Sequence, residues 1–595
     1  MRETFSELLR RSETKLVGFG LAAMAAVYLG FIGLDVATAG SLIKRFGFYF
    51  IFATFAFWVV ALWRLWRQRT PVWRLSRREW WVLLLVIGLF ALVAVNSESF
   101  RSKILYDEFV LQSTAYNMHY FRDTAAMVRG YDLLGIFIST DSYLDKRPNF
   151  FPFLISLVHD LTGYRTENAH WLNVCLLPVA LFLVYYVGRC LNGARGGLLA
   201  LLLLGSLPLL GQNATGSGME LLNVVMILAV IALSAAYLRK PDEESLSALV
   251  LGVVLLAQSR YESAIYVAPV ALVILLGWWR TRTVVLSWLA VLAPLLMMPS
   301  ALQNKVISHS RWMWELKENQ ESRFSPEYLL ANLHGAREFF FNTSARLANS
   351  WPLAVLGLPA LAYLLWRWLR SLRGSSRLPA DHAALLLMGL GMLTNTVLVM
   401  FYYWSNLADP IASRFSLPFY ILLTLAIVVA AAHWDHRVPA SKVLVGGMAL
   451  FVMSVTISHQ AQHLYSHLGI DEIEWEKRYV AALPPGERLI ITNKSTMPWL
   501  LEKIPSILIG RTNLVGDRLQ YQLERNTFRE ILVFQTLRPT TRDGDHQLVP
   551  EDRVPTGFEL ETLTQKRFGT KIDRVSRLVA VNLPATGPKP VTSTP

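Results

Sequence analysis

Residues 80–109 read WWVLLLVIGLFALVAVNSESFRSKILYDEF, an apolar run followed by an adjacent acidic pair. The apolar part is long enough to cross the hydrocarbon core of a bilayer as a helix, which needs roughly 20 residues. Asp107 and Glu108 follow at the point where such a helix returns to water. Carboxylates beside a membrane span are costly to place, so these two are the first candidates for a functional site.

Similar apolar runs recur along the chain, and the composition agrees with them. Of the 595 residues, 53% are hydrophobic and 17% are charged, against roughly a quarter charged in soluble domains. We therefore predict a polytopic α-helical membrane protein. The net charge of +14 comes from basic residues in short loops between spans. It does not indicate nucleic-acid binding, because no basic stretch carries interleaved aromatic residues.

Apolar runs and flanking charges predict about thirteen transmembrane helices. The segment 246–279 is too long for one span and too short for two ordinary spans. We therefore expect two helices there, broken at Ser259-Arg260-Tyr261-Glu262. The predicted spans are 16–38, 47–66, 80–96, 168–188, 197–211, 219–238, two within 246–279, 283–300, 351–369, 383–403, 415–432 and 441–458.

The loops between spans differ in charge, and this difference predicts the orientation. The most basic short loop should be cytoplasmic under the positive-inside rule. Alternation then places the N-terminus inside and the C-terminus outside, in what we expect to be the bacterial inner membrane. The basic residues of that loop are Arg64, Arg67, Arg69, Arg74, Arg77 and Arg78.

This topology divides the chain into three predicted parts. In the last part, strand-like stretches at 488–492, 506–510 and 530–534 alternate with helix-like stretches and predict a small extracytoplasmic α/β domain. Its tail from Pro584 is rich in proline and threonine, and we expect it to be disordered. The parts are the N-terminal pair of spans with its basic loop, 1–79; the main transmembrane domain, 80–458, with external segments 97–167 and 301–350; and the external domain, 459–595.

The acidic pair has the chemistry of a catalytic base. A carboxylate near the membrane surface can take a proton from an acceptor hydroxyl as that hydroxyl attacks. Neighbouring side chains diverge, so one of Asp107 and Glu108 would react while the other positions it or binds a divalent cation. The alternative is that the two residues merely end a span in solvent.

Two groups of cations follow the acidic pair along the chain. Lys146 and Arg147 close the same external segment and could bind phosphate, or else grip lipid head groups. Arg260 lies in the broken helix pair, where an arginine is costly unless it faces a cavity or an anion. A plain ion pair between Arg260 and Glu262 is the competing interpretation.

Other polar residues near the predicted outer ends of spans carry weaker signals. Glu220 opens a span, and a helix N-terminus favours a carboxylate whatever its function; with Glu262 it is a candidate supporting residue. Arg414 begins the twelfth span as another external cation. His119 and His159 lack the spacing of metal ligands, so we predict no metal site from them and interpret them as interfacial.

Taken in order, these motifs resemble the GT-C membrane glycosyltransferases, specifically the protein O-mannosyltransferase and aminoarabinose transferase superfamily. Those enzymes transfer a sugar from a polyprenyl phosphate outside the cytoplasm. The resemblance covers about residues 80–430 and rests on the joint order of the motifs. Family members often show Lys-Pro-Pro where this chain has Arg147-Pro148-Asn149, and Arg-Tyr-x-x-Pro where it has Arg414-Phe415-Ser416-Leu417-Pro418.

The resemblance implies a GT-C-like fold and an inverting displacement. Asp107 would be the catalytic base, with Glu108 as its motif partner. The family members that this chain resembles generally work without a metal, although the acidic pair has the chemistry to hold a divalent ion. The cations expected at the donor phosphate are Lys146, Arg147, Arg260 and Arg414.

The expected partners are a polyprenyl-phosphate sugar, the lipid bilayer and an acceptor that is a protein, glycolipid or polysaccharide. The main alternative function is a transporter or flippase for a lipid-linked sugar, which also needs intramembrane charges and broken helices. The notable charges lie at the outer ends of predicted spans, and the sequence has no evident repeat symmetry. Both observations favour the transferase.

Overall fold

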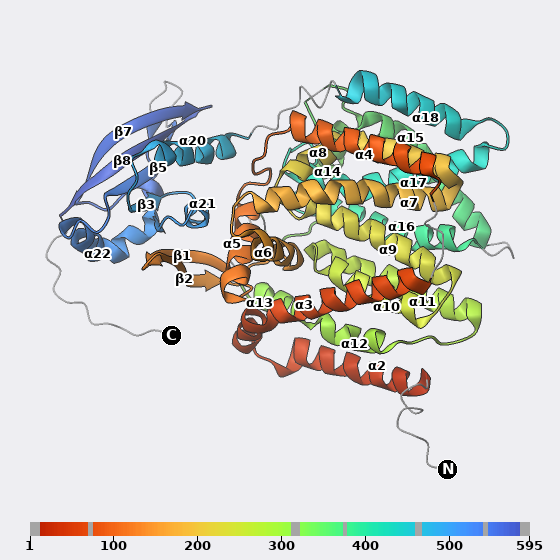
Figure 1. The fold of residues 1–595 in the computed structure, drawn as a ribbon. Helices are drawn as coiled ribbons and strands as arrows, with labels where there is room; N and C mark the ends of the chain where they lie inside the picture. The colour runs from red at the N-terminus through yellow and green to blue at the C-terminus, as the bar shows by residue number, and fades with distance from the viewer. Residues whose placement is uncertain are drawn as a thin grey trace, which may run out of the picture. The chain divides into compact units, whose positions relative to one another are not determined.

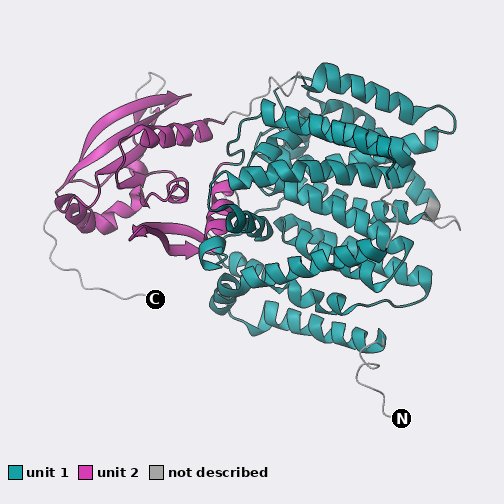
Figure 2. Cartoon of the chain, viewed as in Figure 1, with its two compact units in different colours: residues 1–104, 118–124, 144–465 teal, residues 105–117, 125–143, 466–595 magenta. Residues whose placement is uncertain are grey.

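The computed structural model describes residues 12–68, 75–310, 320, 322–344, 346–372, 378–457, 467–539 and 546–582. Arg69, Arg74 and the predicted disordered tail from Pro584 lie outside these ranges. The chain forms two compact units, which Figure 2 distinguishes by colour. The first, here called the helical unit, comprises Met1–Ile104, Met118–Thr124 and Leu144–Tyr465; the second, the sheet unit, comprises Leu105–Asn117, Ala125–Tyr143 and Ser466–Pro595.

The helical unit is built from apolar helices that are long enough to cross a membrane (Figure 1). In the described part of the chain ten helices meet this criterion. The protein is therefore a polytopic helical membrane protein, as predicted. The ten are Ser12–Gly33, which begins with α2 (Ser12–Val27); Val36–Gln68 (α3); Arg77–Ser97 (α4); Asn168–Gly205 (α7); Glu220–Arg239 (α9); Tyr261–Thr281, with α11 (Val267–Thr281); Trp288–Ser308, with α12 (Trp288–Leu296) and α13 (Met298–Ser308); Trp351–Arg370, within α15 (Trp351–Leu372); Ala380–Met400 (α16); and Ala412–Trp434, with α17 (Leu417–Trp434).

The predicted number of spans was thirteen, and three of them correspond to shorter helical pieces. Residues 197–211 begin in a second arm of α7, because α7 reverses at Asn192 and Gly193, where the backbone is not helical. A methyl group on Gly188 would lie 2.7 Å from the Ala200 Cβ, a contact that a straight helix does not allow. The other two pieces, α10 (Glu243–Ala257) and α18 (Ala440–Phe451), have 15 and 12 residues, fewer than the roughly 20 of a typical span.

The first predicted span, 16–38, has the wrong boundary. The first helix ends at Gly33 after a π-helical turn, and α3 begins at Val36. Asp35 separates them because its carboxylate accepts hydrogen bonds from the Thr38 backbone N at 2.9 Å and the Thr38 hydroxyl at 2.6 Å. Such a side chain starts a new helix in the way an N-cap does. The second helix is consequently 33 residues long.

The sheet unit holds a mixed β-sheet, in the order β4-β3-β5-β8-β7. The first three strands pair in parallel, whereas β8 pairs antiparallel with both β5 and β7. The three predicted strand positions coincide with β3, β4 and β5, but the β7–β8 hairpin was not predicted. The elements are α20 (Leu468–Ala482), β3 (Arg488–Thr492), α21 (Met497–Leu501), β4 (Ser506–Leu508), α22 (Thr512–Glu524), β5 (Glu530–Pro539), β6 (His546–Gln547), β7 (Phe558–Phe568) and β8 (Lys571–Val581).

The two predicted external segments also contain regular structure. Segment 301–350 begins inside α13 and holds α14 (Glu327–Phe341). Segment 97–167 holds α5 (Tyr106–Phe121), β1 (Ala126–Leu133), β2 (Ile136–Tyr143) and α6 (Phe150–Thr162). The strands β1 and β2 form an antiparallel hairpin that belongs to the sheet unit, as does the first part of α5. The boundaries of the two compact units therefore differ from those of the predicted parts, 1–79, 80–458 and 459–595. The division into these three parts stays a prediction.

Candidate active site

The predicted cation Arg260 lies in a buried cluster in the helical unit. Its Nη1 donates to Glu220 Oε1 at 2.6 Å, and its Nε donates to Glu262 Oε1 at 2.5 Å. Arg414 Nε lies 3.4 Å from the same Glu220 oxygen. Arg260, Glu220 and Arg414 are 2%, 2% and 4% exposed. Four predicted site residues therefore meet at one point, and the Arg260–Glu262 ion pair that was the competing interpretation is part of the same cluster.

Three interruptions of helical structure create this cluster. Arg260 has extended backbone (φ −146°, ψ 152°) between the end of α10 and a 3₁₀ turn at Tyr261–Tyr266. Glu220 is the first residue of α9, and Arg414 lies in a second 3₁₀ turn, Ala412–Ser416, that leads into α17. The predicted break within 246–279 is thus present. Non-helical backbone inside a membrane protein is tolerated where it is buried in protein or lines a cavity, so three coincident breaks indicate a polar site.

The charges of the cluster balance, but one donor remains available. Two arginines face two carboxylates, and the Phe415 ring lies beside both guanidinium groups, with centroid distances of 5.3 Å to Arg260 and 5.2 Å to Arg414. Among the residues that the structure describes, Arg260 Nη2 has no hydrogen-bond partner although it is buried. A guanidinium has five N–H donors in a fixed fork that suits phosphate oxygens. The cluster can therefore accept an anion at Arg260.

The predicted cation Arg147 is held close to this break by backbone contacts. Its side chain binds both Asp145 oxygens at 2.8 Å, and Gln303 Nε2 donates to the carbonyl oxygens of Asp145 and Arg147 at 2.7 and 2.9 Å. At the start of α6, the Phe150 backbone N donates to the Gln258 carbonyl at 3.2 Å. Because Gln258 lies just before Arg260, the segment that carries Lys146 and Arg147 is tied to the Arg260 break.

The acidic pair belongs to the sheet unit, and its two members differ in burial. Asp107 is partly exposed at the first turn of α5, whereas Glu108 is completely buried. Burying a carboxylate is costly unless polar groups compensate for it. A residue that only ended a span in solvent would not be buried in this way. The two carboxylates are therefore suited to different roles, with Asp107 the accessible one.

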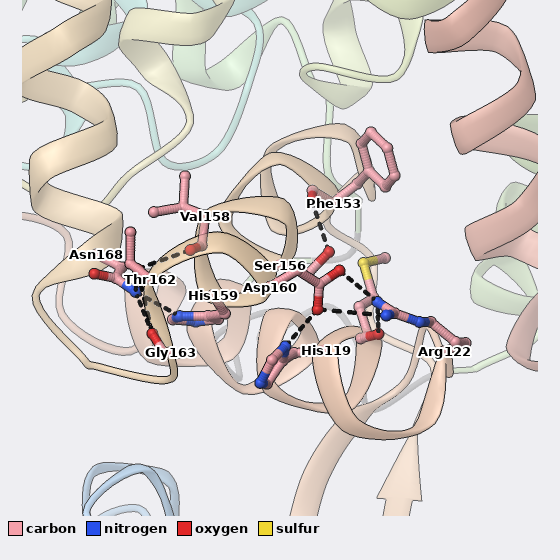
Figure 3. A network of polar contacts seen from close by, with 11 residues as sticks. His119, Arg122, Phe153, Ser156, Val158, His159, Asp160, Thr162, Gly163 and Asn168 are labelled. Atoms are coloured by element: carbon pink, nitrogen blue, oxygen red, sulfur yellow. Dashed lines mark hydrogen bonds and ion pairs between the residues drawn. The ribbon is translucent and has the colours of Figure 1, made fainter.

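The other end of α5 is clamped to α6 within the helical unit (Figure 3). Asp160 accepts from His119 Nδ1 at 2.6 Å and from Arg122 Nη1 at 2.9 Å. The Arg122 guanidinium also lies 4.8 Å from the centroid of the Phe48 ring of α3. The sequence indicated an interfacial role for His119 and gave no signal for Arg122 or Asp160, because their pairing joins residues 38 to 41 positions apart.

The ionisation of this network follows from its surroundings. Burial works against the charge of Asp160, but hydrogen bonds from Arg122 and His119 hold the pKa of its carboxyl below the usual value. Burial, helped by the neighbouring His119, lowers the pKa of His159 to about 4. At neutral pH Asp160 is therefore charged and His159 neutral, with Asn168 Nδ2 2.9 Å from His159 Nδ1. The network holds the end of α5 against α6.

No group of three or more histidine, cysteine or carboxylate side chains with the arrangement of a metal site occurs among the described residues. Free cysteines Cys175 and Cys190 lie on α7.

With this geometry in view, the chain can be compared with known proteins. Residues 146–302 match a family model described as dolichyl-phosphate-mannose-protein mannosyltransferase. The family resemblance is confirmed for this segment. The matched segment contains Arg147, Glu220, Arg260 and Glu262, whereas Asp107 and Arg414 lie outside it. No curated protein matches the chain.

Two solved structures are also similar to the chain. ArnT from Cupriavidus metallidurans bound to undecaprenyl phosphate has 12% identity and a TM-score of 0.49, and the match covers 84% of this chain and 98% of that one. The arabinosyltransferase EmbB from Mycobacterium smegmatis has 17% identity and a TM-score of 0.32, with 68% of this chain and 44% of that one covered.

Proposed function

We propose that this protein is a glycosyltransferase that moves a sugar from a polyprenyl-phosphate donor to an acceptor hydroxyl on the extracytoplasmic side of the membrane. The observation that carries the proposal is the buried cluster of Arg260, Glu220 and Arg414 at three helix breaks, with one Arg260 donor available. The mannosyltransferase match over residues 146–302 supports the enzyme class.

The donor phosphate would bind at Arg260. Glu220 and Glu262 hold two of the guanidinium nitrogens, Nη1 and Nε, so the fork is oriented before the ligand arrives. A pre-oriented fork loses little side-chain entropy when it binds a phosphate. Arg414 beside Glu220, and Lys146 and Arg147 on the tethered segment, would supply further positive charge to the same anion.

An apolar groove is available for the lipid tail. It has a volume of about 510 Å³ and is lined by side chains of α2, α10, α11 and α12, among them Val254, Val267 and Met297. The helices α10 and α11 are those that meet at the Arg260 break. An isoprenoid chain buried there gains hydrophobic stabilisation in proportion to its area, while its phosphate reaches the cluster.

The proposed chemistry is a single inverting displacement. The acceptor hydroxyl oxygen attacks the anomeric carbon of the sugar, and Asp107 takes the hydroxyl proton as the new C–O bond forms. The bond between the anomeric carbon and the phosphate oxygen breaks, and the electron pair leaves with polyprenyl phosphate. The arginines stabilise the charge that develops on this leaving group. Glu108, buried beside the base, would position it.

The proposal is tested by incubating the purified protein with undecaprenyl phosphate that carries mannose or aminoarabinose, together with a cell-envelope extract that supplies acceptor hydroxyls. The wild-type protein should release undecaprenyl phosphate and form a glycosylated protein, glycolipid or polysaccharide. Asp107→Asn should reduce this release by about 10³-fold, because removing a general base costs roughly 10²–10⁴-fold, and should leave donor binding intact. The matched control is Asp141→Asn, which changes a carboxylate on β2 that is 53% exposed.

The outcomes separate the transferase from its main alternative. A flippase would move the lipid-linked sugar across the bilayer without releasing undecaprenyl phosphate, and that result would overturn the proposal. An active Asp107→Asn protein would overturn the assignment of the base. Loss of activity in both Asp107→Asn and Asp141→Asn would show a general defect of the external segment.

A further inference from the structure

The first turn of α5, which carries Asp107, is packed into the core of the sheet unit. Phe109 and Val110 lie one turn or less after Asp107 and are buried. Hydrophobic side chains buried in one cluster fix the backbone that carries them. The cluster joins Phe109 and Val110 to Ala126 of β1, Ile473 of α20, and Met497 and Leu501 of α21.

Two closer contacts reinforce this packing. A methyl group on Gly469 would lie 3.1 Å from Leu105 Cδ2, so α20 approaches the residue before α5 closely. Thr496 Oγ1 donates to the Val128 carbonyl of β1 at 3.1 Å. Thr496 lies in the loop after the carboxyl end of β3, the edge at which open parallel sheets usually bind ligands. Here the chain's own first external segment occupies that edge.

A buried charged cluster holds the same edge together. Lys494, two residues after β3, lies 3.1 Å from Glu472, 2.8 Å from Glu476 and 2.7 Å from Asp573. These side chains come from α20 and β8, so the lysine links the helix to two strands. Thr536 of β5 donates to the second Asp573 oxygen at 2.8 Å. The cluster thus fixes α20, which supplies Ile473 to the packing around α5.

The charges of this cluster affect the pKa of Tyr106, the first residue of α5. Although Tyr106 is 38% exposed, the burial of the rest of its side chain raises its pKa to about 12, with Lys494 opposing the shift and Glu476, Glu472 and Asp573 adding to it. The residue next to Asp107 is therefore within electrostatic reach of the Lys494 cluster. Hydrophobic packing and charge both connect the acidic turn to the sheet unit.

We infer that the sheet unit positions the base, with Ile473 of α20 as a positioning residue that acts through Phe109 and Val110 on Asp107. The inference rests on the proposed function only in naming Asp107 as the base. It assigns the sheet unit a positioning part in catalysis, because the acidic turn packs into the core of that unit. Loosening α20 should then slow the chemical step and leave the affinity for the donor unchanged.

The experiment compares Ile473→Ala with Ile531→Ala in the full-length protein. Both isoleucines are buried, at 4% and 2% exposure, and both changes remove the same atoms. Ile531 belongs to β5 and to a different cluster, with Leu489, Ile491 and Leu519 among its members. Hydrogen exchange of residues 105–117 reports the order of the acidic turn, and kcat and KM for the undecaprenyl-phosphate sugar report its function.

Ile473→Ala should speed exchange in residues 105–117 by about tenfold or more. It should also lower kcat by about 10- to 100-fold with KM unchanged, since small misplacements of a catalytic group have effects of this size. Ile531→Ala should alter neither quantity by more than about twofold while it speeds exchange in β5. Unchanged exchange at 105–117 in Ile473→Ala, or the same change in both variants, would overturn the inference.

The exchange measurement separates this inference from the proposed function. Asp107→Asn should be inactive and yet show normal exchange at 105–117, because it leaves the packing of Phe109 and Val110 in place. If Asp107→Asn is active while Ile473→Ala still loosens the turn, the assignment of the base fails and the coupling of α20 to the turn stands.

Discussion

The two buried charged clusters of this protein look alike in composition but differ in how their donors are used. Around Lys494, the three N–H groups of one ammonium face three carboxylates. Around Arg260, two arginines face two carboxylates, and Arg260 Nη2 has no partner among the described residues. An ammonium has three donors and a guanidinium five. The Lys494 cluster is therefore saturated, whereas the Arg260 cluster retains a donor.

This difference separates a cluster that holds structure from one that is suited to bind a ligand. A saturated buried lysine fixes the elements around it and offers nothing to an incoming anion. A guanidinium oriented by two carboxylates, with its Nη2 nitrogen unused, offers fixed hydrogen bonds to a phosphate. The comparison predicts that changes in the Lys494 cluster alter stability and that changes in the Arg260 cluster alter ligand affinity.

The largest effect is expected for Lys494→Met. This change leaves three carboxylates buried without their cation, and breaking a buried pair in this way costs about 3–5 kcal/mol. The free energy of unfolding of the sheet unit should fall by that amount, measured by hydrogen exchange in β3 and β5. The control is Lys477→Met on α20, the helix that carries Glu472 and Glu476. Its partner Glu502 is 40% exposed, so this change should cost under about 1 kcal/mol. Equal losses in the two variants would contradict the structural role of Lys494.

A smaller change in the free energy of unfolding is expected when the pH is varied and Glu476 titrates. Burial, with contributions from Asp573 and Glu472 and against that of Lys494, raises the pKa of Glu476 from 4.5 to about 7. A raised carboxyl pKa means that the folded state holds the proton more tightly than the unfolded state. The resulting stability is fully present below pH 4.5 and is lost as the pH rises through about 7, with a size on the order of 2–3 kcal/mol.

Glu476→Gln should remove this dependence because glutamine resembles the protonated acid. Between pH 5 and pH 8, the protection of β3 against exchange, corrected for the intrinsic exchange rate at each pH, should fall in the wild-type protein and stay nearly constant in the variant. Tyr106 does not titrate in this range, because its pKa is about 12. Parallel pH profiles for the two proteins would show that Glu476 does not titrate in the folded state as described.

The sequence predicted features that depend on local composition. The apolar runs identified the spans, and the interruption of one such run by Ser259-Arg260-Tyr261-Glu262 identified the break at Arg260. Local patterns failed where a polar side chain redirects the backbone, as Asp35 does between the first two helices. The β7–β8 hairpin was missed because the apolar alternation of β7 is confined to its first residues, Phe558–Glu561, and its pairing with β8 shifts register twice.

Sequence patterns did not predict contacts between segments that are far apart in the chain. The convergence of Glu220, Arg260 and Arg414 depends on how three helix ends meet, and none of the three residues carries that information in its neighbours. The same holds for Phe109 and Ile473, which belong to one hydrophobic cluster although they lie far apart in the sequence. The sequence therefore identified candidate residues, and the fold determines which of them lie together.

The most direct test of the account is the affinity of the purified protein for undecaprenyl phosphate, the proposed leaving group. Arg260→Lys keeps the charge but removes the fork that includes Nη2, and should raise Kd by about tenfold, since a charge-assisted hydrogen bond contributes about 1.5–3 kcal/mol. The matched control is Arg239→Lys, which alters the ion pair with Asp381 at the other end of α9, and it should leave Kd unchanged. An Arg260→Lys protein that binds undecaprenyl phosphate as tightly as the wild type would contradict the assignment of Arg260 to the donor phosphate.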